Sequence, residues 1–408
     1  MLSLHRVRLR TLAFASRRLA AGALLLGGLL QACGGGHDGA IESLPPIPQV
    51  VRIDARQGDP IGARLLNTLE LHEFRAALAE AGGRAPQLTP RYRVQAWRLD
   101  YHTIDASGHL VEASALLGIP LKLQGSGSPV LSYQHGTLAR DQRAPSNHAV
   151  PEEPALLLAS AGYIVLAPDY VGYGRSKGLP HPYLLATPSA AAVLDLLSAA
   201  KRWRREQGIA DNGQLFLAGY SEGGYVTMAA HRALQSGAHA LHAELVASVP
   251  GAGPYHVGAT LDAWQQRFAE HSPLLARLLN PTLMKNLGVA ARRLVRDHLL
   301  REALGDDADV RFRPDFIDNY LADDEAALER DSNVHDWRPE RPLWLYHGRE
   351  DHTVPYESAM QALQAMRSRG APDTALTDCP ARPAGHRSCV LPYWDFMLAR
   401  IGALARDL

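Results

Sequence analysis

The chain has little cysteine and no excess of either charge, and the apolar run near its amino terminus spans only 12 residues. Its 408 residues include 42 lysines and arginines against 42 aspartates and glutamates, so the net charge is zero. Without a basic excess, the sequence gives no sign of a nucleic-acid partner. The 18 histidines are scattered and form no H-E-x-x-H pattern. We therefore expect no metal site and no cofactor.

The amino terminus resembles a targeting segment. Several arginines precede the apolar run Leu19–Leu30, which is too short to span a bilayer but suits a signal peptide. The run ends in Leu30-Gln31-Ala32-Cys33, which resembles the lipobox of bacterial lipoproteins. We expect residues 1–32 to be removed and Cys33 to carry a lipid that anchors the chain to a membrane. A simple secretory signal cleaved nearby is the alternative.

Either interpretation predicts export from the cytoplasm. Gly34 follows the cysteine, which favours the outer membrane of the cell envelope, with a periplasmic or secreted protein as the alternative. If Cys33 is lipidated, Cys379 and Cys389 remain as a pair that could form a disulfide in an oxidising compartment. Residues 33–59 are rich in glycine and proline at their start and predict a flexible tether.

The rest of the chain predicts an α/β fold. A helix is expected over Ala63–Ala81, ended by two glycines, and a β-hairpin over Tyr92–Thr103 and His109–Ile119. Apolar strands then alternate with helices, which indicates a mostly parallel sheet covered on both faces and preceded by the antiparallel hairpin. The expected strands are 129–134, 162–167, 215–218, 243–249, 343–347 and 374–377. The expected helices are 154–161, 187–207, the helix after Ser221, 357–366 and 393–405.

Residues 255–335 interrupt this alternation. They predict helices at 261–269, 273–279, 289–304 and 314–321, with no strand. We interpret them as a helical cap inserted in the core before the strand that bears the catalytic acid. The predicted core therefore comprises residues 60–254 and 336–408.

One stretch predicts a nucleophile. Gly219-Tyr220-Ser221-Glu222-Gly223 lies between an apolar strand and a helix-competent segment, the context of a G-x-S-x-G nucleophile elbow. The turn must be tight to raise the Ser221 hydroxyl out of the sheet, and the flanking glycines leave room for crowded backbone. An ordinary turn between strand and helix is the alternative.

The acid and the base are expected after later strands. Asp351 follows the strand 343–347 and is our candidate acid, with Glu350 as the alternative. His352 adjoins the acid, so its side chain should point away from it. His386 follows in a loop between Cys379 and Cys389, where a disulfide would fix its position, and is our candidate base.

The oxyanion site and the substrate pocket are predicted from neighbouring loops. One oxyanion donor should be the N–H of Glu222, and Thr137 is our choice for the second, although the sequence leaves open which amide of that loop points inward. His135 and Gly136 in the same loop, Tyr173 after the next strand, and Tyr255 at the start of the cap are the candidate substrate-binding residues. The alternative for His135 is a structural residue of its loop, and the alternative for Tyr173 is packing beneath the nucleophile elbow.

These motifs together resemble the α/β-hydrolase superfamily. The segments are Tyr133-Gln134-His135-Gly136-Thr137, Asp169-Tyr170-x-Gly172-Tyr173-Gly174-x-Ser176, His181-Pro182-Tyr183, Gly219–Gly224, Gly251-Ala252-Gly253-Pro254 and His347-Gly348-x-x-Asp351-x-x-Val354-Pro355. Within the superfamily, the chain is similar to the secretory lipase branch typified by yeast lipase A enzymes. That resemblance covers about residues 60–408 and implies ester hydrolysis, a cap and no metal; the lipobox departs from the yeast pattern.

The sequence thus predicts a membrane-tethered serine hydrolase that cleaves carboxylic esters, with an ester or a lipid as substrate. Ser221 would attack, His386 would move the proton, and Asp351 would orient His386. The alternatives are a serine peptidase or amidase of the same fold and a non-catalytic lipoprotein that binds a ligand. The sequence does not indicate an oligomeric state.

Overall fold

The computed structural model describes residues 56–408 except 238, 272–283, 287 and 306. These residues lie in one compact unit, Ile47–Leu408. The predicted signal peptide, Cys33, most of the tether and the predicted helix 273–279 lie outside the described residues. Within the described part, Gln57 donates a hydrogen bond to Asp195 and the Gly58 amide donates one to the His102 carbonyl oxygen. The described end of the predicted tether is therefore packed against the core.

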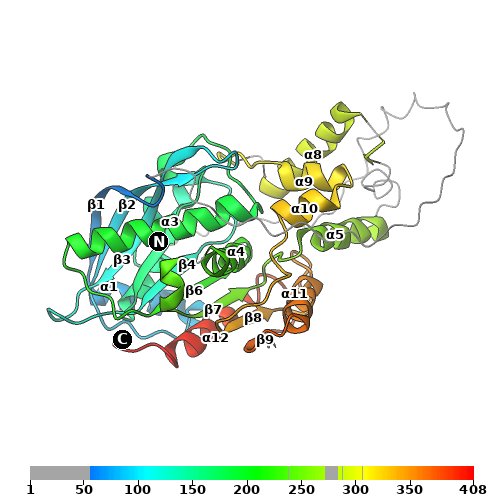
Figure 1. The fold of residues 1–408 in the computed structure, drawn as a ribbon. Helices are drawn as coiled ribbons and strands as arrows, with labels where there is room; N and C mark the ends of the chain where they lie inside the picture. The colour runs from blue at the N-terminus through cyan, green and yellow to red at the C-terminus, as the bar shows by residue number, and fades with distance from the viewer. Residues whose placement is uncertain (1–55, 238, 272–283, 287, 306) are drawn as a thin grey trace, which may run out of the picture. The chain divides into compact units, whose positions relative to one another are not determined.

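A nine-stranded sheet forms the centre of the molecule (Figure 1), in the order β1-β2-β3-β5-β4-β6-β7-β8-β9. The pairs β1–β2, β2–β3 and β3–β5 are antiparallel, and the pairs from β5–β4 to β8–β9 are parallel. The strands are β1 Pro60–Leu69, β2 Val94–Ile104, β3 Leu110–Pro120, β4 Val130–Gln134, β5 Ile164–Pro168, β6 Leu215–Tyr220, β7 Leu245–Gly251, β8 Leu343–His347 and β9 Thr374–Asp378. The predicted mixed sheet with a leading antiparallel hairpin is confirmed.

The prediction for residues 63–81 was wrong in its first half. Pro60–Leu69 forms the edge strand β1, which pairs along its length with β2, and only Leu71–Ala81 forms the helix α1. The spacing of Leu65, Leu66 and Leu69 is compatible with a helix. Most of β1 is exposed or half-buried, so pairing with β2, rather than an alternating buried face, sets its conformation.

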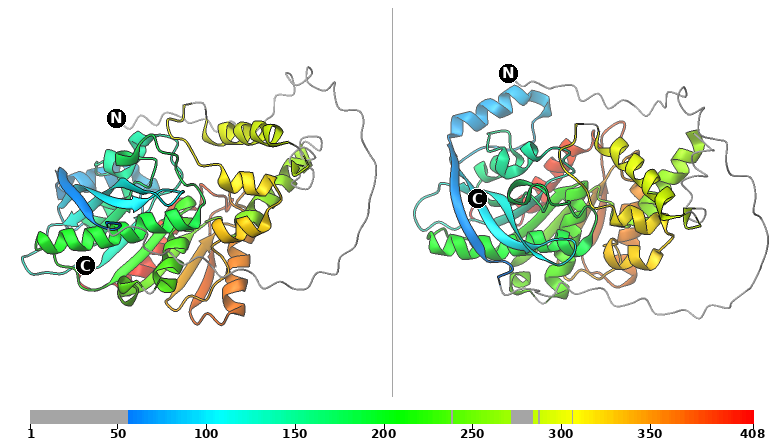
Figure 2. Two further views of the ribbon diagram at one scale, coloured as in Figure 1. Left: turned by 45° about the horizontal axis from the view of Figure 1, so that its top comes forward. Right: turned by 90° about the horizontal axis from the view of Figure 1, so that it is seen from above.

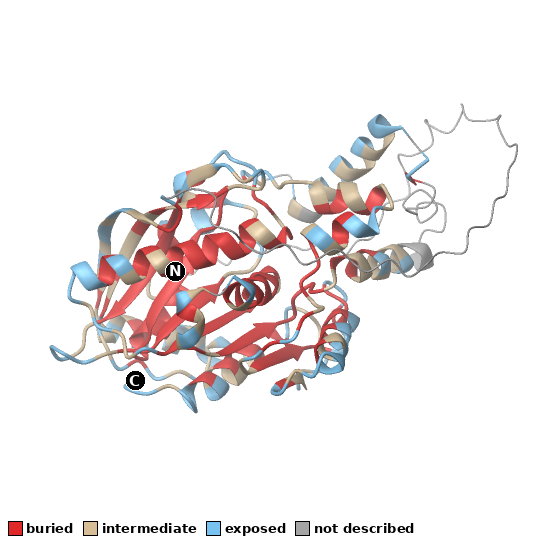
Figure 3. Ribbon diagram, viewed as in Figure 1, coloured by how far each residue is buried: buried red, intermediate tan, exposed pale blue. Residues whose placement is uncertain are grey.

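Helices cover both faces of the sheet (Figures 1 and 2). One apolar cluster packs α3, α4 and α11 against one face, and a second packs α1, α2 and α12 against the other. The strands β4 to β8 and most of α4 are buried (Figure 3). The core helices are α1 Leu71–Ala81, α2 Pro154–Ser160, α3 Ala186–Glu206, α4 Glu222–Ser236, α11 Tyr356–Ser368 and α12 Val390–Gly402. The 3₁₀ helices are Gly82–Arg84, Asp141–Arg143, Pro145–Asn147, Gly174–Ser176 and Ala240–Glu244.

A helical segment separates β7 from β8, where the cap was expected. Its described helices are α5 Val257–His271, α8 Val289–Leu304, α9 Asp315–Leu321 and α10 Glu325–Asp331. The sequence analysis did not predict α10, whose first turn is capped by the Asp324 side chain. The Tyr225 hydroxyl donates to the Ser332 carbonyl oxygen (2.7 Å), so the end of this segment is bonded to α4. No described helix has the length and apolar character needed to cross a membrane.

The parallel strands bring distant residues to one edge. Ser221 follows β6, Asp351 lies four residues after β8, and His386 lies in the loop between β9 and α12. The loop 135–137 directly follows β4, the strand that pairs with β6. Because parallel strands end at the same edge of a sheet, these four segments converge there.

Candidate active site

Ser221 occupies a strained position at the turn from β6 into α4. Its φ and ψ are 61° and −123°, in a region that L-residues rarely adopt. The Ser221 amide donates to the Gly251 carbonyl oxygen at the end of β7 (2.9 Å), which fixes the turn from the neighbouring strand. A strained serine between a strand and a helix is the arrangement that raises a nucleophile above a sheet.

Two glycines make this turn possible. A Cβ added at Gly219 or at Gly223 would overlap the Gln134 carbonyl oxygen at the end of β4. Any larger residue would therefore push β4 away from the turn. This explains why the sequence has glycine two residues before and two residues after Ser221.

The structure brings the three predicted triad residues together. His386 Nε2 lies 2.8 Å from Ser221 Oγ, and His386 Nδ1 lies 2.6 Å from Asp351 Oδ2. An ionised carboxylate can only accept, so His386 Nδ1 carries the proton and Nε2 presents its lone pair to the serine hydroxyl. The arrangement is suited to removing the proton of Ser221 as its oxygen attacks a carbonyl carbon.

The second oxygen of Asp351 is held by backbone. Asp351 Oδ1 accepts hydrogen bonds from the amides of Thr353 (2.8 Å) and Val354 (2.9 Å), which fixes the plane of the carboxylate. His347 lies on the other side: its Nε2 donates to the Val354 carbonyl oxygen (2.9 Å) and lies 3.3 Å from Asp351 Oδ2.

These partners keep Asp351 charged. Burial by itself would raise the pKa of Asp351, but the hydrogen bonds from His347 and His386 outweigh it and hold that pKa below its usual range. The carboxylate is therefore ionised at neutral pH. Because the folded-state pKa is lowered, its contribution to stability is present above about pH 4, the pKa of an unfolded aspartate, and is lost as the pH falls further.

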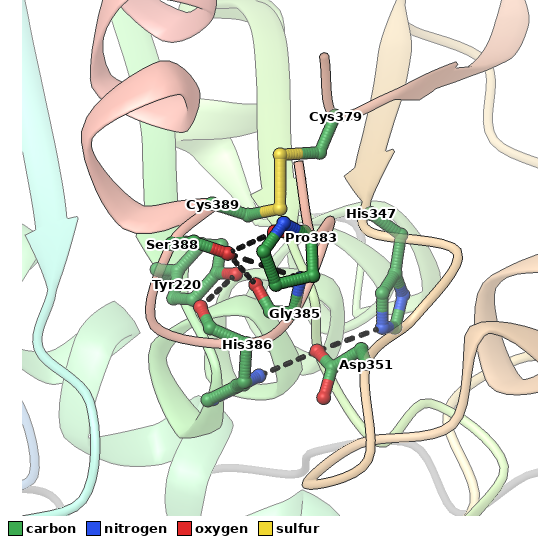
Figure 4. The surroundings of a disulfide bond; sticks show 9 residues. All are labelled: Tyr220, His347, Asp351, Cys379, Pro383, Gly385, His386, Ser388 and Cys389. Atoms are coloured by element: carbon green, nitrogen blue, oxygen red, sulfur yellow. Dashed lines mark hydrogen bonds and ion pairs between the residues drawn. A yellow bond between two sulfur atoms is a disulfide. The ribbon is translucent and has the colours of Figure 1, made fainter. Parts of the chain in front are cut away.

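The loop that carries His386 is closed by a disulfide between Cys379 and Cys389 (Figure 4), with the Cα atoms 5.9 Å apart. Within this loop Ser388 Oγ donates to the Pro383 carbonyl oxygen (2.6 Å) and accepts from the Gly385 amide (3.0 Å). The Tyr220 hydroxyl, from the residue before the nucleophile, donates to the His386 carbonyl oxygen (2.7 Å). The backbone of His386 is thus fixed both by its own closed loop and by the hydrogen bond from Tyr220.

We expect the disulfide to stabilise this loop. Closing a loop of this length removes chain entropy from the unfolded state, worth about 2.8 kcal/mol. The variant Cys379→Ala/Cys389→Ala should therefore lose up to about that free energy of unfolding, measured by denaturant titration, and should hydrolyse substrate more slowly because His386 is less fixed. Dithiothreitol should reproduce both effects in the natural chain and change nothing in the variant. Equal stability of the two chains would contradict this account.

The loop after β4 lies beside the nucleophile. A Cβ built on Gly136 would lie 3.7 Å from Ser221 Cβ and 3.3 Å from the Tyr220 carbonyl oxygen. The side chain of Thr137 points elsewhere, with Oγ1 3.2 Å from the Tyr183 hydroxyl. The Glu222 amide is the first of α4 and has no partner within the helix. The two predicted oxyanion donors therefore belong to segments that flank Ser221, and their role stays a prediction.

The predicted substrate-binding residues are held by internal contacts. His135 Nδ1 lies 2.7 Å from the Gly136 carbonyl oxygen, its ring packs on Tyr170, and burial lowers its pKa. Tyr173 is fully buried and donates its hydroxyl to the Leu138 carbonyl oxygen (2.6 Å). Tyr255 is also fully buried. The contacts and burial described here are internal, and direct contact of these residues with substrate stays a prediction.

Sequence reasoning missed two polar partners of the site. The first is His347, which appeared only as the first residue of the quoted motif that contains Asp351. The second is His181, whose Nε2 lies 2.6 Å from Glu222 Oε1 in the interior. Both histidines lie in motifs that the sequence analysis quoted, but nothing in their spacing indicates which carboxylate they meet. In the part of the chain that the structure describes, no group of three or more His, Cys, Asp and Glu side chains could hold a metal ion.

Comparison with known proteins agrees with the fold. Residues 150–376 match the family described as serine aminopeptidase, S33 (Hydrolase_4). A cell-wall-degrading esterase, LipA of Xanthomonas oryzae, has a TM-score of 0.67 and 25% identity over 86% of this chain and 100% of its own.

Two further structures share the fold. A hydrolase of Legionella pneumophila has a TM-score of 0.67 and 21% identity, covering 84% of this chain and 97% of its own. Lipase A of Candida antarctica in its closed state has a TM-score of 0.55 and 17% identity, covering 85% and 83%.

The fold is therefore that of an α/β-hydrolase, as the sequence motifs predicted. The match to the family covers more than half of the chain, so the chain belongs to the Hydrolase_4 (S33) family. It is a hydrolase, and the bond that it cleaves is the subject of the following proposal.

Proposed function

We propose that the chain is a serine hydrolase of carboxylic esters. The observation that carries the proposal is the relay from Ser221 Oγ through His386 to Asp351, with 2.8 Å and 2.6 Å between the paired atoms. An ester as substrate is supported by the likeness to LipA of Xanthomonas oryzae, which is described as an esterase.

The reaction proceeds through an acyl-enzyme. Ser221 Oγ gives its proton to His386 Nε2 and bonds to the ester carbonyl carbon, and the oxyanion is held by the Glu222 amide and an amide of the loop at Thr137. The carbon–oxygen bond to the alcohol then breaks, and His386 returns its proton to the departing alcohol oxygen. Water, deprotonated by His386, attacks the acyl carbon, releases the carboxylic acid and restores Ser221.

A peptidase is the second candidate, because the matching family is described as serine aminopeptidase. An aminopeptidase must also bind the charged amino terminus of its substrate. Three carboxylates on segments that follow the central strands or start α4 already have partners: Asp351 bonds His386, Glu222 bonds His181, and Asp169, directly after β5, accepts from Ser146. This favours the ester, whose recognition needs no free carboxylate.

A substrate panel separates the two candidates. We expect hydrolysis of p-nitrophenyl esters over a series of acyl chain lengths, and at least about 10³-fold lower kcat/KM on aminoacyl p-nitroanilides with a free amino group. Faster cleavage of the anilides would favour the peptidase. If neither series is cleaved while the protein is folded, the non-catalytic binding protein becomes the better interpretation.

We also propose that the chain is an exported lipoprotein of the cell envelope, anchored in the outer membrane through Cys33. The proposal is supported by the lipobox-like sequence at Cys33 and by the Cys379–Cys389 disulfide, a bond typical of oxidising compartments. When the full chain is expressed in a bacterial host, we expect it to take up labelled palmitate and to sediment with membranes. The Cys33→Ser variant should lose the label and leave the membrane fraction. Unchanged labelling of that variant would contradict the proposal.

A further inference from the structure

The residue that follows the nucleophile, Glu222, forms a buried pair with His181. His181 and Glu222 are each 2% exposed, and His181 Nε2 lies 2.6 Å from Glu222 Oε1. His181 Nδ1 lies 2.9 Å from the Val171 carbonyl oxygen, which can only accept, so Nδ1 carries a proton. The contact between Nε2 and Oε1 then needs a second proton. That proton lies either on the imidazole, giving an ion pair, or on the carboxyl group, giving a neutral pair.

One of the four aromatic rings around His181, that of Tyr170, stacks on the imidazole at an interplanar angle of 18°, so that its face can stabilise a cation. The four rings have centroids 5.1 to 6.0 Å from that of His181. They are Tyr170, Tyr173, Tyr183 and Phe312. Glu222 Oε2 has no hydrogen-bond partner among the described residues, so His181 is the polar partner that neutralises Glu222.

The other titratable groups around the pair are neutral. Burial raises the pKa of Tyr170, Tyr173, Tyr183 and Tyr225 far above neutral pH, and burial lowers the pKa of His135. The hydroxyl of Tyr173 bonds the Leu138 carbonyl oxygen and that of Tyr183 lies against Thr137. The charge beside the start of α4 is therefore set by His181 and Glu222 themselves.

His181 is also fixed from the inserted segment. Its amide donates to the Arg311 carbonyl oxygen (2.7 Å), and its carbonyl oxygen accepts from the Arg313 amide (2.7 Å). The imidazole thus connects the chain next to Phe312 with Glu222, the first residue of α4. The backbone amide of Glu222 is the one expected to face the oxyanion in the proposed reaction.

We propose that His181 is a positioning residue of the acyl-transfer site. As an imidazolium it holds the Glu222 side chain, and through it the first amide of α4, and it cancels a carboxylate charge that would otherwise repel the oxyanion. This inference rests on the proposed ester hydrolysis. A buried, uncompensated carboxylate on the residue whose amide is expected to face the oxyanion would raise the energy of the transition state, because the interaction is poorly screened in the interior.

The test compares His181→Phe, Glu222→Gln and the double variant over pH 5.5 to 9.5. Removing the imidazole leaves a buried carboxyl group without its partner, and such a group ionises only as the pH rises. In His181→Phe the ratio of variant to natural kcat/KM should therefore fall at least tenfold from pH 5.5 to pH 9.5. At pH 9 the loss should reach about 10²-fold and lie in kcat rather than KM. In the double variant position 222 cannot ionise, so the ratio of variant to natural kcat/KM should no longer change with pH. His109→Phe, an exposed histidine in a turn, is the matched control and should behave as the natural chain.

A merely structural role for His181 predicts a ratio that is flat with pH, and that result would overturn the inference. Because His181→Phe could fail to fold, a second measurement uses the natural chain. Nitrogen NMR should show a proton on each ring nitrogen of His181; a ring with one unprotonated nitrogen would also overturn the inference. Either negative result leaves the proposed function intact if the natural chain hydrolyses esters. If the proposed ester hydrolysis itself is wrong, the natural chain will be no more active than Ser221→Ala.

Discussion

Replacing Ser221 by alanine should abolish ester hydrolysis, with kcat lowered about 10⁶-fold and by no less than about 10³-fold. The alanine removes the oxygen that bonds to the carbonyl carbon, and nothing else at the end of β6 can replace it. His386→Ala should cost about as much, because the serine hydroxyl is a poor nucleophile while it keeps its proton. The double variant should be no worse than either single variant, since the two residues act as a unit. Initial rates of p-nitrophenol release measure all three.

The chain offers matched controls for both residues. Ser126→Ala removes an exposed serine hydroxyl, and His352→Ala removes the exposed histidine that adjoins Asp351. Both variants should retain the natural rate. Full activity of Ser221→Ala would contradict the assigned nucleophile. Equal losses in His352→Ala and His386→Ala would contradict the assigned base.

The second large effect is expected at Asp351. In Asp351→Asn the amide is close in size to the carboxylate but can donate to His386 Nδ1, which favours the tautomer with the proton on Nε2. That tautomer cannot accept the Ser221 proton, and no negative charge remains to stabilise the imidazolium. We expect kcat to fall about 10⁴-fold while KM changes little.

Glu350→Gln is the control for this substitution. Glu350 adjoins Asp351 and was the alternative acid in the sequence, but its side chain is exposed, and its backbone amide donates to the Ala384 carbonyl oxygen. We expect activity within about twofold of the natural chain. A larger loss in Glu350→Gln than in Asp351→Asn would exchange the two assignments. Thermal unfolding of both variants separates a chemical effect from loss of the fold.

Much of the fold could be predicted because the central strands are continuous apolar runs that end in glycine, proline or polar residues. The strand before Ser221 and the strand that ends at His347 are fully buried, and each appears in the sequence as a short apolar run. The strand Pro60–Leu69 could not be recognised, since it lies at the sheet edge with few buried side chains. Its conformation depends on pairing with β2, about 35 residues later in the chain.

The candidate site was predictable to the extent that chemistry fixes the order of its residues. G-x-S-x-G marks Ser221, and the requirement for an acid and a histidine after later strands leaves few choices. Which atoms meet was not predictable: Asp351 also contacts His347, and Glu222 turns its side chain to His181, 41 residues earlier in the chain. Such contacts depend on loop conformations that neither periodicity nor spacing encodes.

Covalent labelling is the most direct test of the central claim, that Ser221 is activated by His386. The natural chain is incubated with an ethyl p-nitrophenyl phosphonate, and the modified residue is located by mass spectrometry of its peptides. We expect one equivalent of p-nitrophenolate to be released and one phosphonyl group to be found on Ser221, with no labelling of Ser221→Ala and labelling of His386→Ala slowed at least about 10³-fold. A folded chain that remains unlabelled, or one labelled on another residue, would contradict the account.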